Sequence, residues 1–194
     1  MTPFDIELYD KDHAIRVADL TQQIALALGL RGSVVSMLGM AGLLHDIGKT
    51  DIPLSILNKP GELTQDEWAI MRQHGRLGYD RIQALPLERC PCLRDDARML
   101  CAIVALQHHE RLDGSGYMGM TDVDISYSAR IVAVADVFDA FSHDRPYRKA
   151  WPLRNALHAI YVRRGIEFEP AIVDALLEVV EGEEDSLPAV AGNR

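Results

Sequence analysis

Titratable side chains beside or within apolar stretches are the residues of this 194-residue sequence best suited to chemistry. His45 and Asp46 follow one apolar stretch, His108 and His109 follow another, and Asp136 interrupts a third. A buried aspartate costs several kcal/mol unless it is paired or bound to a metal. A single buried histidine is more often a hydrogen-bonded packing residue, but two such pairs and a buried aspartate require a common partner.

A divalent metal ion would satisfy this set of groups. Imidazole and carboxylate together suit first-row ions such as iron, manganese and zinc. His13 and His74 fall in two further stretches with a helical pattern, so the candidate ligands are spread along the chain. Helices that point such ligands into the core of a bundle can form a two-metal site.

The elements that must position these ligands are predicted to be helices. Apolar residues recur with the helical period, whereas the alternation typical of strands is weak. We therefore predict an all-α fold, a compact bundle of about seven helices. The expected helices cover residues 13–28, 33–47, 64–85, 94–108 and 128–141, and two more begin near Pro152 and Pro170. A glycine-bearing loop is expected over 111–124.

An excess of acidic residues limits the classes of partner. The chain carries 29 acidic and 20 basic residues, for a net charge of −9, which argues against a general DNA binder or a binder of anionic membranes. No apolar stretch approaches the roughly 20 residues of a membrane span, and the first residues lack the apolar region of a signal peptide. We therefore expect a cytoplasmic location, in which the three cysteines are reduced thiols.

One domain accounts for the length of the chain. Hydrophobic residues make up 48% of the sequence, enough to bury a core without disulfides. No internal repeat or change in composition marks a linker. We assign residues 1–182 to a single domain and expect residues 183–194 to form a flexible tail.

Several motifs resemble those of a known family. The motif HDIGK at 45–49 resembles the HD-phosphohydrolase signature, and HHERLDGSGY at 108–117 is similar to the hallmark of HD-GYP domains, the bacterial cyclic di-GMP phosphodiesterases. Further stretches match in the family's order: HAIRV at 13–17, IPLSILNKP at 52–60, His74 with Gly78, DVFDA at 136–140 and DRPYRKA at 144–150. The resemblance covers residues 11–172 and implies an HD-domain type of helical fold.

The resemblance also implies a ligand set and a cofactor. The metal ligands would be His13, His45, Asp46, His74, His108, His109 and Asp136. Asp46 would bridge two divalent ions, with iron or manganese favoured and zinc as an option. Asp139, three residues after Asp136, is expected to orient one of the ligand imidazoles. His143 and His158 match no ligand of the family, and we interpret them as surface or packing residues.

Two positions depart from the family's pattern. Members that hold three metals have a glutamate four residues before the first histidine, where this sequence has Tyr9. We therefore predict a binuclear site, unless Asp10 or Asp12 reaches the metals. Met118 stands where the family name promises proline, so the motif is Gly-Tyr-Met, and the partner contacts attributed to this loop in relatives are in question.

The activity implied by the resemblance is hydrolysis of cyclic di-GMP by a metal-bridging hydroxide. The product would be linear pGpG, and further cleavage to GMP is left open. If the second expected helix continues through Gly48, Lys49 lies on the face of His45 and Asp46 and stabilises charge on the phosphoryl oxygens. The alternative is a solvated lysine at a helix end.

Other groups are assigned to the substrate by resemblance. Arg145 and Arg148 would hold the second phosphate of the dinucleotide, although a basic cluster is usually a solvated face. Tyr117 is expected at the rim of the site, where it stacks on a base or closes the core. Trp68 and Trp151 show no such pattern, and we expect both to pack in the core.

Three other functions stay open at this stage. One is a slow or inactive module that binds a cyclic dinucleotide and acts through partners such as diguanylate cyclase domains or a separate sensory or response-regulator protein. Another is a hydrolase of a different cyclic nucleotide. The third is an iron-dependent oxygenase, against which Lys49 and the basic cluster argue. The metal's identity and the oligomeric state are not encoded in these motifs.

Overall fold

Helices and the turns between them make up the described chain. A computed structural model describes residues 8–86, 90–91, 93–144 and 149–186. Over these residues it contains α-helices, two short 3-10 helices (η1 and η2) and two isolated bridges, but no strand. The α-helices are α1 (Lys11–Ala27), α2 (Ser33–Leu44), α3 (Leu54–Leu57), α4 (Gln65–Met71), α5 (His74–Ala84), α6 (Asp95–Gln107), α7 (Tyr127–Ser142), α8 (Leu153–Tyr161) and α9 (Pro170–Ser186). The all-α prediction is confirmed, although the described chain has nine α-helices instead of about seven.

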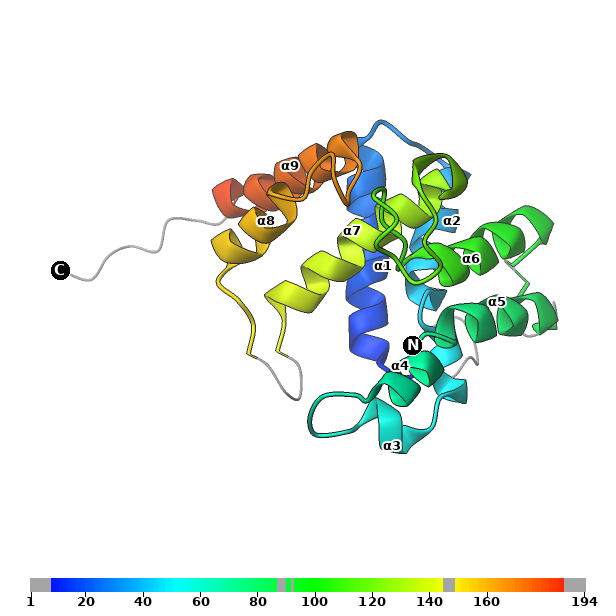
Figure 1. Ribbon diagram of the computed structural model, residues 1–194. Coiled ribbons are helices and arrows are strands. Elements are labelled where there is room, and N and C mark those ends of the chain that lie inside the picture. The colour runs from blue at the N-terminus through cyan, green and yellow to red at the C-terminus, as the bar shows by residue number, and fades with distance from the viewer. Residues whose placement is uncertain (1–7, 87–89, 92, 145–148, 187–194) are drawn as a thin grey trace.

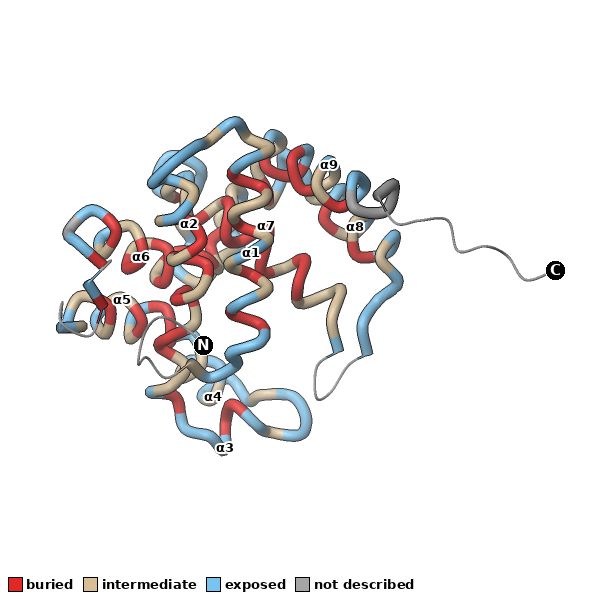
Figure 2. Tube along the Cα trace, turned by 180° about the vertical axis from the view of Figure 1, so that it is seen from behind, coloured by how far each residue is buried: buried red, intermediate tan, exposed pale blue. Residues whose placement is uncertain are grey.

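Helices α1, α2, α6 and α7 surround the core. α1 packs against α2 and α7, and α2 packs against α6. α5 covers α6 on one side, whereas α8 and α9 lie at the other end of the bundle (Figure 1). Figure 2 shows that the buried residues gather on the inner faces of these helices. Fully buried apolar side chains such as Leu44 of α2 and Val134 of α7 belong to one continuous cluster.

The second helix ends earlier than its apolar pattern predicts. α2 stops at Leu44, and the 3-10 helix η1 (Ile47–Asp51) follows, so a continuous helix through Ile47 is wrong. η1 lies very close to α5: a Cβ atom added to Gly48 would lie 2.0 Å from the carbonyl oxygen of His74. The tighter turn therefore seats η1 against α5, and only glycine fits at the contact.

The third expected helix is divided into α4 and α5 at Arg72 and Gln73. A capping box at Thr64 opens α4, at the position where the third helix was expected to begin. Nδ1 of His74 lies 2.7 Å from the carbonyl oxygen of Met71, an acceptor that a continuous helix would offer to a backbone amide. This competition explains why the helix breaks before His74 and turns α5 toward α6.

The remaining elements agree closely with their predicted positions. Pro152 is the N-cap of α8, and Pro170 is the first residue of α9, which extends to Ser186. The expected loop over 111–124 contains η2 (Asp122–Asp124), and Gly114 and Gly119 in it have positive φ angles of 79° and 70°. None of the described helices combines the length and apolar character that crossing a membrane requires.

Candidate metal centre

Histidine and aspartate side chains from distant parts of the chain converge beside α2. One group of four is Asp46, His74, His108 and His109, and a group of three is His13, His45 and Asp136; within each group the ligand atoms lie within 4.8 Å of one another. The structure thus brings together every residue of the predicted ligand set. They come from α1, the α2–η1 junction, α5, the C-terminal end of α6 and the middle of α7.

Asp46 lies between the two groups, with one carboxylate oxygen toward each. Its Oδ1 is 3.4 Å from Nε2 of His74 and 3.6 Å from Nε2 of His108. Its Oδ2 is 3.3 Å from Nε2 of His45 and 3.8 Å from Nε2 of His13. A carboxylate in this position can share its two oxygens between two cations.

The imidazole rings are fixed so that their Nε2 atoms face the centre. Nδ1 of His45 is 2.6 Å from the carbonyl oxygen of Gly42, and Nδ1 of His108 is 3.0 Å from that of Ala105. His74 makes the equivalent contact with Met71. Because a carbonyl oxygen only accepts, each of these rings carries its proton on Nδ1 and presents the Nε2 lone pair inward, as a metal ligand must.

Buried polar atoms in the centre lack hydrogen-bond partners within the described residues. These atoms are Nε2 of His13, Nε2 of His45 and Oδ1 of Asp46. Leaving such atoms unsatisfied costs about 1–3 kcal/mol each. Imidazole nitrogens and a carboxylate oxygen are ligands that divalent first-row ions accept. The donor set therefore fits a divalent metal site.

Asp139 orients His13 from the far side of the ring, as its spacing from Asp136 predicts. Its Oδ2 is 2.6 Å from Nδ1 of His13, and Arg16 donates to both of its oxygens at 2.6 and 3.0 Å. This leaves Nε2 of His13 facing Oδ1 of Asp136 at 3.3 Å. Asp139 is buried, so its charge acts on His13 with little screening by water.

The pKa values in the centre are displaced in both directions. Burial lowers the pKa of His13, but the neighbouring carboxylates of Asp136 and Asp139 outweigh it and raise the pKa to about 9. Burial lowers the pKa of His74 to about 4. Burial also raises the pKa of Asp46, but the charge of Lys49 and the contacts with neighbouring imidazoles outweigh this effect and hold the pKa well below its usual range. Asp46 is therefore ionised at neutral pH.

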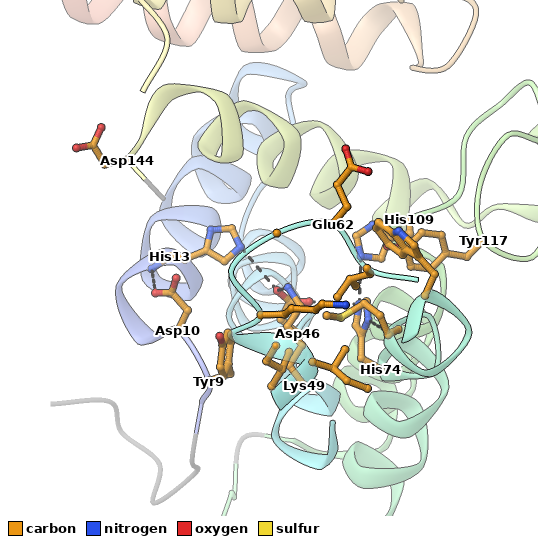
Figure 3. Close-up of a pocket in the computed structure, with 17 residues that line it drawn as sticks. Tyr9, Asp10, His13, Asp46, Lys49, Glu62, His74, His109, Tyr117 and Asp144 are labelled. Carbon is orange, nitrogen blue, oxygen red and sulfur yellow. Dashed lines mark hydrogen bonds and ion pairs between the residues drawn. The ribbon is translucent and has the colours of Figure 1, made fainter. Parts of the chain in front are cut away.

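A cavity of about 640 Å³ opens onto the centre (Figure 3). His13, Asp46, His74 and His109 line its inner part. Lys49 also lines it, and its Nζ lies 2.5 Å from Oδ2 of Asp46. The predicted proximity of Lys49 to Asp46 is present, but a 3-10 turn produces it instead of the continuous helix on which the prediction relied.

Tyr117 packs on a candidate ligand at the edge of the cavity. Its ring centroid is 4.2 Å from that of His109, and the guanidinium of Arg72 lies 5.5 Å from the tyrosine ring. Tyr117 therefore covers His109 and also lines the cavity, in agreement with a position at the rim.

Glu110 is a residue that the sequence analysis missed. Its side chain is buried, and its carboxylate oxygens accept the backbone amides of Met118 and Met120, both at 2.9 Å. Gly116 lies directly on Glu110, since an added Cβ would be 2.5 Å from the Cα of Glu110. The signal available in the sequence was a charged residue directly after two candidate ligands and before a glycine-rich loop.

Tyr9 lines the cavity without joining the ligand groups. Its hydroxyl donates to Oδ1 of Asn58 at 2.7 Å. The side chain of Asp10 accepts the amide of His13 as the N-cap of α1, and Asp12 is exposed. Neither aspartate belongs to the two ligand groups.

The structure also bears on the predictions made for two tryptophans, two further histidines and two arginines. Trp68 does not pack in the core: it is 43% exposed and lines the cavity, because α4 lies on the surface and buries none of its residues. The core position expected for Trp151 is also wrong, since this residue is 38% exposed and stacks on Phe141. His158 is exposed, whereas His143 contacts Asp139 at 3.0 Å. Arg145 and Arg148 lie outside the described residues.

Comparison with known proteins gives matches over nearly the whole chain. The signature of the HD domain family matches residues 8–172. The cyclic di-GMP phosphodiesterase response regulator RpfG of Xanthomonas campestris pv. campestris is 44% identical over 163 residues, which cover 84% of this chain and 41% of that protein. A 3′3′-cGAMP-specific phosphodiesterase of Vibrio cholerae is 38% identical over 86% of this chain and 30% of its own length. The chain therefore spans less than half of these two relatives.

The fold is also similar to a solved structure. Bd1817, an HD-GYP-type protein from Bdellovibrio bacteriovorus, matches with a TM-score of 0.67 and 20% sequence identity. The match covers 89% of this chain and 52% of that protein. At this level of identity the similarity concerns the fold.

Proposed function

The chain belongs to the HD domain family, and on this basis we propose that it is a metal-dependent phosphodiesterase that hydrolyses cyclic di-GMP to linear pGpG. The relative from Xanthomonas campestris is named a cyclic di-GMP phosphodiesterase, which supports this substrate. Cleavage of pGpG to GMP would be a second step at the same centre.

The observation that carries the proposal is the position of Asp46 between two groups of inward-facing ligands. Phosphodiester hydrolysis requires neutralised phosphate charge, an attacking water and a stabilised leaving oxygen. Two divalent cations held about 4 Å apart supply these conditions when bound. In the proposed site, His74, His108 and His109 hold one ion, His13, His45 and Asp136 hold the other, and Asp46 contacts both.

The metals proposed for this centre are iron or manganese, with zinc as a third option. The donor set is rich in imidazole and contains two carboxylates, a combination that all three ions accept. Since the types of ligand do not distinguish among these three ions, the availability of each metal in the cell would determine which one is bound.

Lys49 is proposed to bind the phosphoryl oxygens. Its ammonium group lies at the cavity and contacts Asp46, so a phosphate at the centre comes within its reach. Tyr117 is proposed to close the rim against the substrate, and its contact with His109 supports this place. We assign Arg145 and Arg148 to the second phosphate on the resemblance of their motif alone.

Regulation is proposed to come from a partner. The relative from Xanthomonas campestris is named a response regulator, and this chain covers 41% of it. A separate sensory or response-regulator protein, or a diguanylate cyclase domain, is the kind of partner we propose.

Product analysis after incubation with cyclic di-GMP tests the function. We expect the metal-loaded protein to form linear pGpG and the His45→Ala variant to form none. His158→Ala, which changes an exposed histidine of α8, is the matched control and should retain activity. If the protein binds cyclic di-GMP tightly but forms no product when loaded with iron, manganese or zinc, it is a binding module and not a phosphodiesterase. Oxygen consumption with a polyol substrate would indicate an oxygenase instead.

A further inference from the structure

The cavity beside the metal centre has two walls of different chemistry. One wall carries the candidate metal ligands and Lys49. The other is largely apolar and is lined by Ile56, Leu57, Leu63, Trp68 and Met71. The volume of about 640 Å³ lies within the range of sites for small molecules. Binding of metal ions and phosphate explains the residues of the first wall, but it does not explain why the second wall is apolar.

Trp68 is the aromatic side chain of this apolar wall. It belongs to neither of the two buried apolar clusters of the described chain, and 43% of its surface is exposed. Ile70, two residues further along α4, packs against the smaller cluster of Ile52, Ile56 and Leu57. An indole that lines a cavity instead of the core offers a flat face on which any nucleobase can stack.

Glu62 supplies a polar group to the same cavity. Glu62 lines the cavity from the segment that connects α3 to α4, and Figure 3 shows its side chain on that segment. Other carboxylates of the cavity are engaged: Asp10 accepts the amide of His13, and Asp144 accepts Lys149 and the amide of Ala150. Among the described residues, the carboxylate of Glu62 has no hydrogen-bond or ion-pair partner.

The segment that carries Glu62 is anchored on both sides. Asn58 accepts the hydroxyl of Tyr9 at 2.7 Å, and Lys59 contacts Glu67 at 2.5 Å. Glu67 also accepts the amide of Thr64 as part of the capping box of α4. The segment around Glu62 is therefore fixed at the cavity, while the carboxylate of Glu62 is available to a ligand.

We propose that Trp68 and Glu62 form a guanine subsite of this cavity, with the indole stacking on the purine and the carboxylate accepting its N1–H and N2–H groups. The inference rests on the proposed function, since it assumes a cyclic dinucleotide at the metal centre. Adenine has an acceptor at N1 and lacks the N2 amino group. The carboxylate that accepts two hydrogen bonds from guanine would therefore face the N1 lone pair of adenine. The subsite thus selects guanine over adenine by repulsion as well as by attraction.

Tryptophan fluorescence tests the subsite without requiring turnover. The sequence has two tryptophans, so Trp151→Phe leaves Trp68 as the single indole, and phenylalanine keeps the stacking on Phe141. GMP and AMP are the probes, because they carry the bases and contain no diester bond. We expect GMP to quench Trp68 with an affinity at least about 10-fold higher than that of AMP, as charged hydrogen bonds allow.

Glu62→Gln in the same background should reduce the preference for GMP to about threefold or less. Asp66→Asn, which removes an exposed carboxylate of α4 outside the cavity, is the matched control and should keep the preference. Equal quenching by GMP and AMP, or an unchanged preference in Glu62→Gln, would overturn the subsite.

Hydrolysis of the cyclic diesters separates this inference from the proposed function. We expect cyclic di-GMP and 3′3′-cGAMP, which both carry guanine, to be cleaved with kcat/KM at least about 10-fold above that of cyclic di-AMP. Equal cleavage of all three would refute the subsite and leave the phosphodiesterase intact. Guanine-selective quenching that depends on Glu62, with no cleavage of any diester, would support the subsite and refute the proposed function.

Discussion

Asp139 sets the orientation and charge of His13 from outside the ligand groups. Its carboxylate contacts the imidazole at 2.6 Å and is itself held by Arg16. Such outer partners typically change metal affinity by 10–100-fold when they are replaced. A carboxylate at this position makes Nε2 of His13 a stronger donor to a cation.

We expect Asp139→Asn to weaken metal binding by about 10–100-fold. The asparagine oxygen still accepts the proton of Nδ1, so the ring keeps its orientation, while the side chain loses its charge and one of its two hydrogen bonds from Arg16. Competition with a metal-sensitive dye measures the affinity. Asp174→Asn, on an exposed ion pair of α9, serves as the control. An unchanged affinity in Asp139→Asn would show that the charge of Asp139 has no part in metal binding.

The metal-free protein should have a characteristic dependence of stability on pH. The pKa of His13 rises from about 6.5 unfolded to about 9 folded, so its stabilisation is complete below pH 6.5 and is lost as the pH rises through 9. The pKa of His74 falls to about 4, so its neutral form destabilises the fold as the pH drops from 6.5 toward 4.

Together these two histidines favour greatest stability near pH 6.5 in the presence of a chelator. Urea unfolding between pH 4 and pH 9 measures the free energy of unfolding. In His13→Ala the loss of stability at high pH should shrink, while the loss at low pH should remain. A loss at high pH that is unchanged in His13→Ala would contradict the assignment.

At the residue scale, the types and spacing of the ligands could be predicted because each is a rare polar group beside or within an apolar stretch. His45, Asp46 and Asp136 stand out for this reason. Trp68 could not be placed in the same way, since an aromatic residue at helical spacing fits a core helix and a surface helix equally well. Its exposure depends on how α4 packs, which the local sequence does not determine.

At the scale of elements, the loop after α6 depends on Glu110. The carboxylate accepts two loop amides, and the loop places Tyr117 against His109. Met118 contributes its backbone amide to this arrangement and exposes 45% of its surface. The backbone of the Gly-Tyr-Met motif is therefore held by Glu110 without a proline.

We expect Glu110→Gln to destabilise the protein by about 1–3 kcal/mol, because one amide then faces a side-chain NH₂ group instead of an acceptor. Hydrogen exchange should accelerate at Met118 and Met120. Glu178→Gln, on the exposed face of α9, is the matched control. If exchange at both amides is unchanged in Glu110→Gln, the carboxylate does not hold the loop.

The contact between η1 and α5 leaves no room for a side chain at Gly48. Since a Cβ at Gly48 would meet the carbonyl of His74 at 2.0 Å, we expect Gly48→Ala to destabilise the fold by more than the usual 1–3 kcal/mol of overpacking. Gly182→Ala, with no atom within 4 Å of the added Cβ, should be neutral or stabilise α9 by up to about 1 kcal/mol. Thermal unfolding compares the two, and similar melting temperatures would contradict the close approach.

Helix boundaries at this scale were predictable where a local signal sets them. Thr64, Pro152 and Pro170 mark the starts of helices as expected. The ends of α2 and α4 were not, because Gly48 packs against the distant helix α5 and because the ring of His74 occupies the carbonyl oxygen of Met71. Both deviations occur next to candidate ligands, where the backbone is shaped by the site.

At the scale of the whole molecule, a chain of net charge −9 presents a site for an anion. Two divalent cations against Asp46 and Asp136, with neutral imidazoles, leave the centre positive by about two charges before any anion binds. Lys49 adds a further positive charge at the cavity. The local field is therefore opposite in sign to that of the protein as a whole.

The overall architecture was predictable because the helical period persists along the chain and strand-like alternation is weak. The convergence of His13, His74 and Asp136 was not deducible from period or spacing, since it depends on how α1, α5 and α7 pack. Burial of Asp136 in an apolar stretch indicated a partner shared with the two adjacent pairs, and the resemblance of the motifs to a known family implied that His13 and His74 join the same ligand set.

The number of metal ions per chain tests the central claim most directly. Elemental analysis of protein purified without chelators should find two divalent ions per chain in the wild type and less than one in Asp46→Asn, because that residue serves both ligand groups. Asp66→Asn should keep both ions. A wild-type protein that cleaves cyclic di-GMP with no bound metal, or an Asp46→Asn variant that retains two ions, would contradict the account.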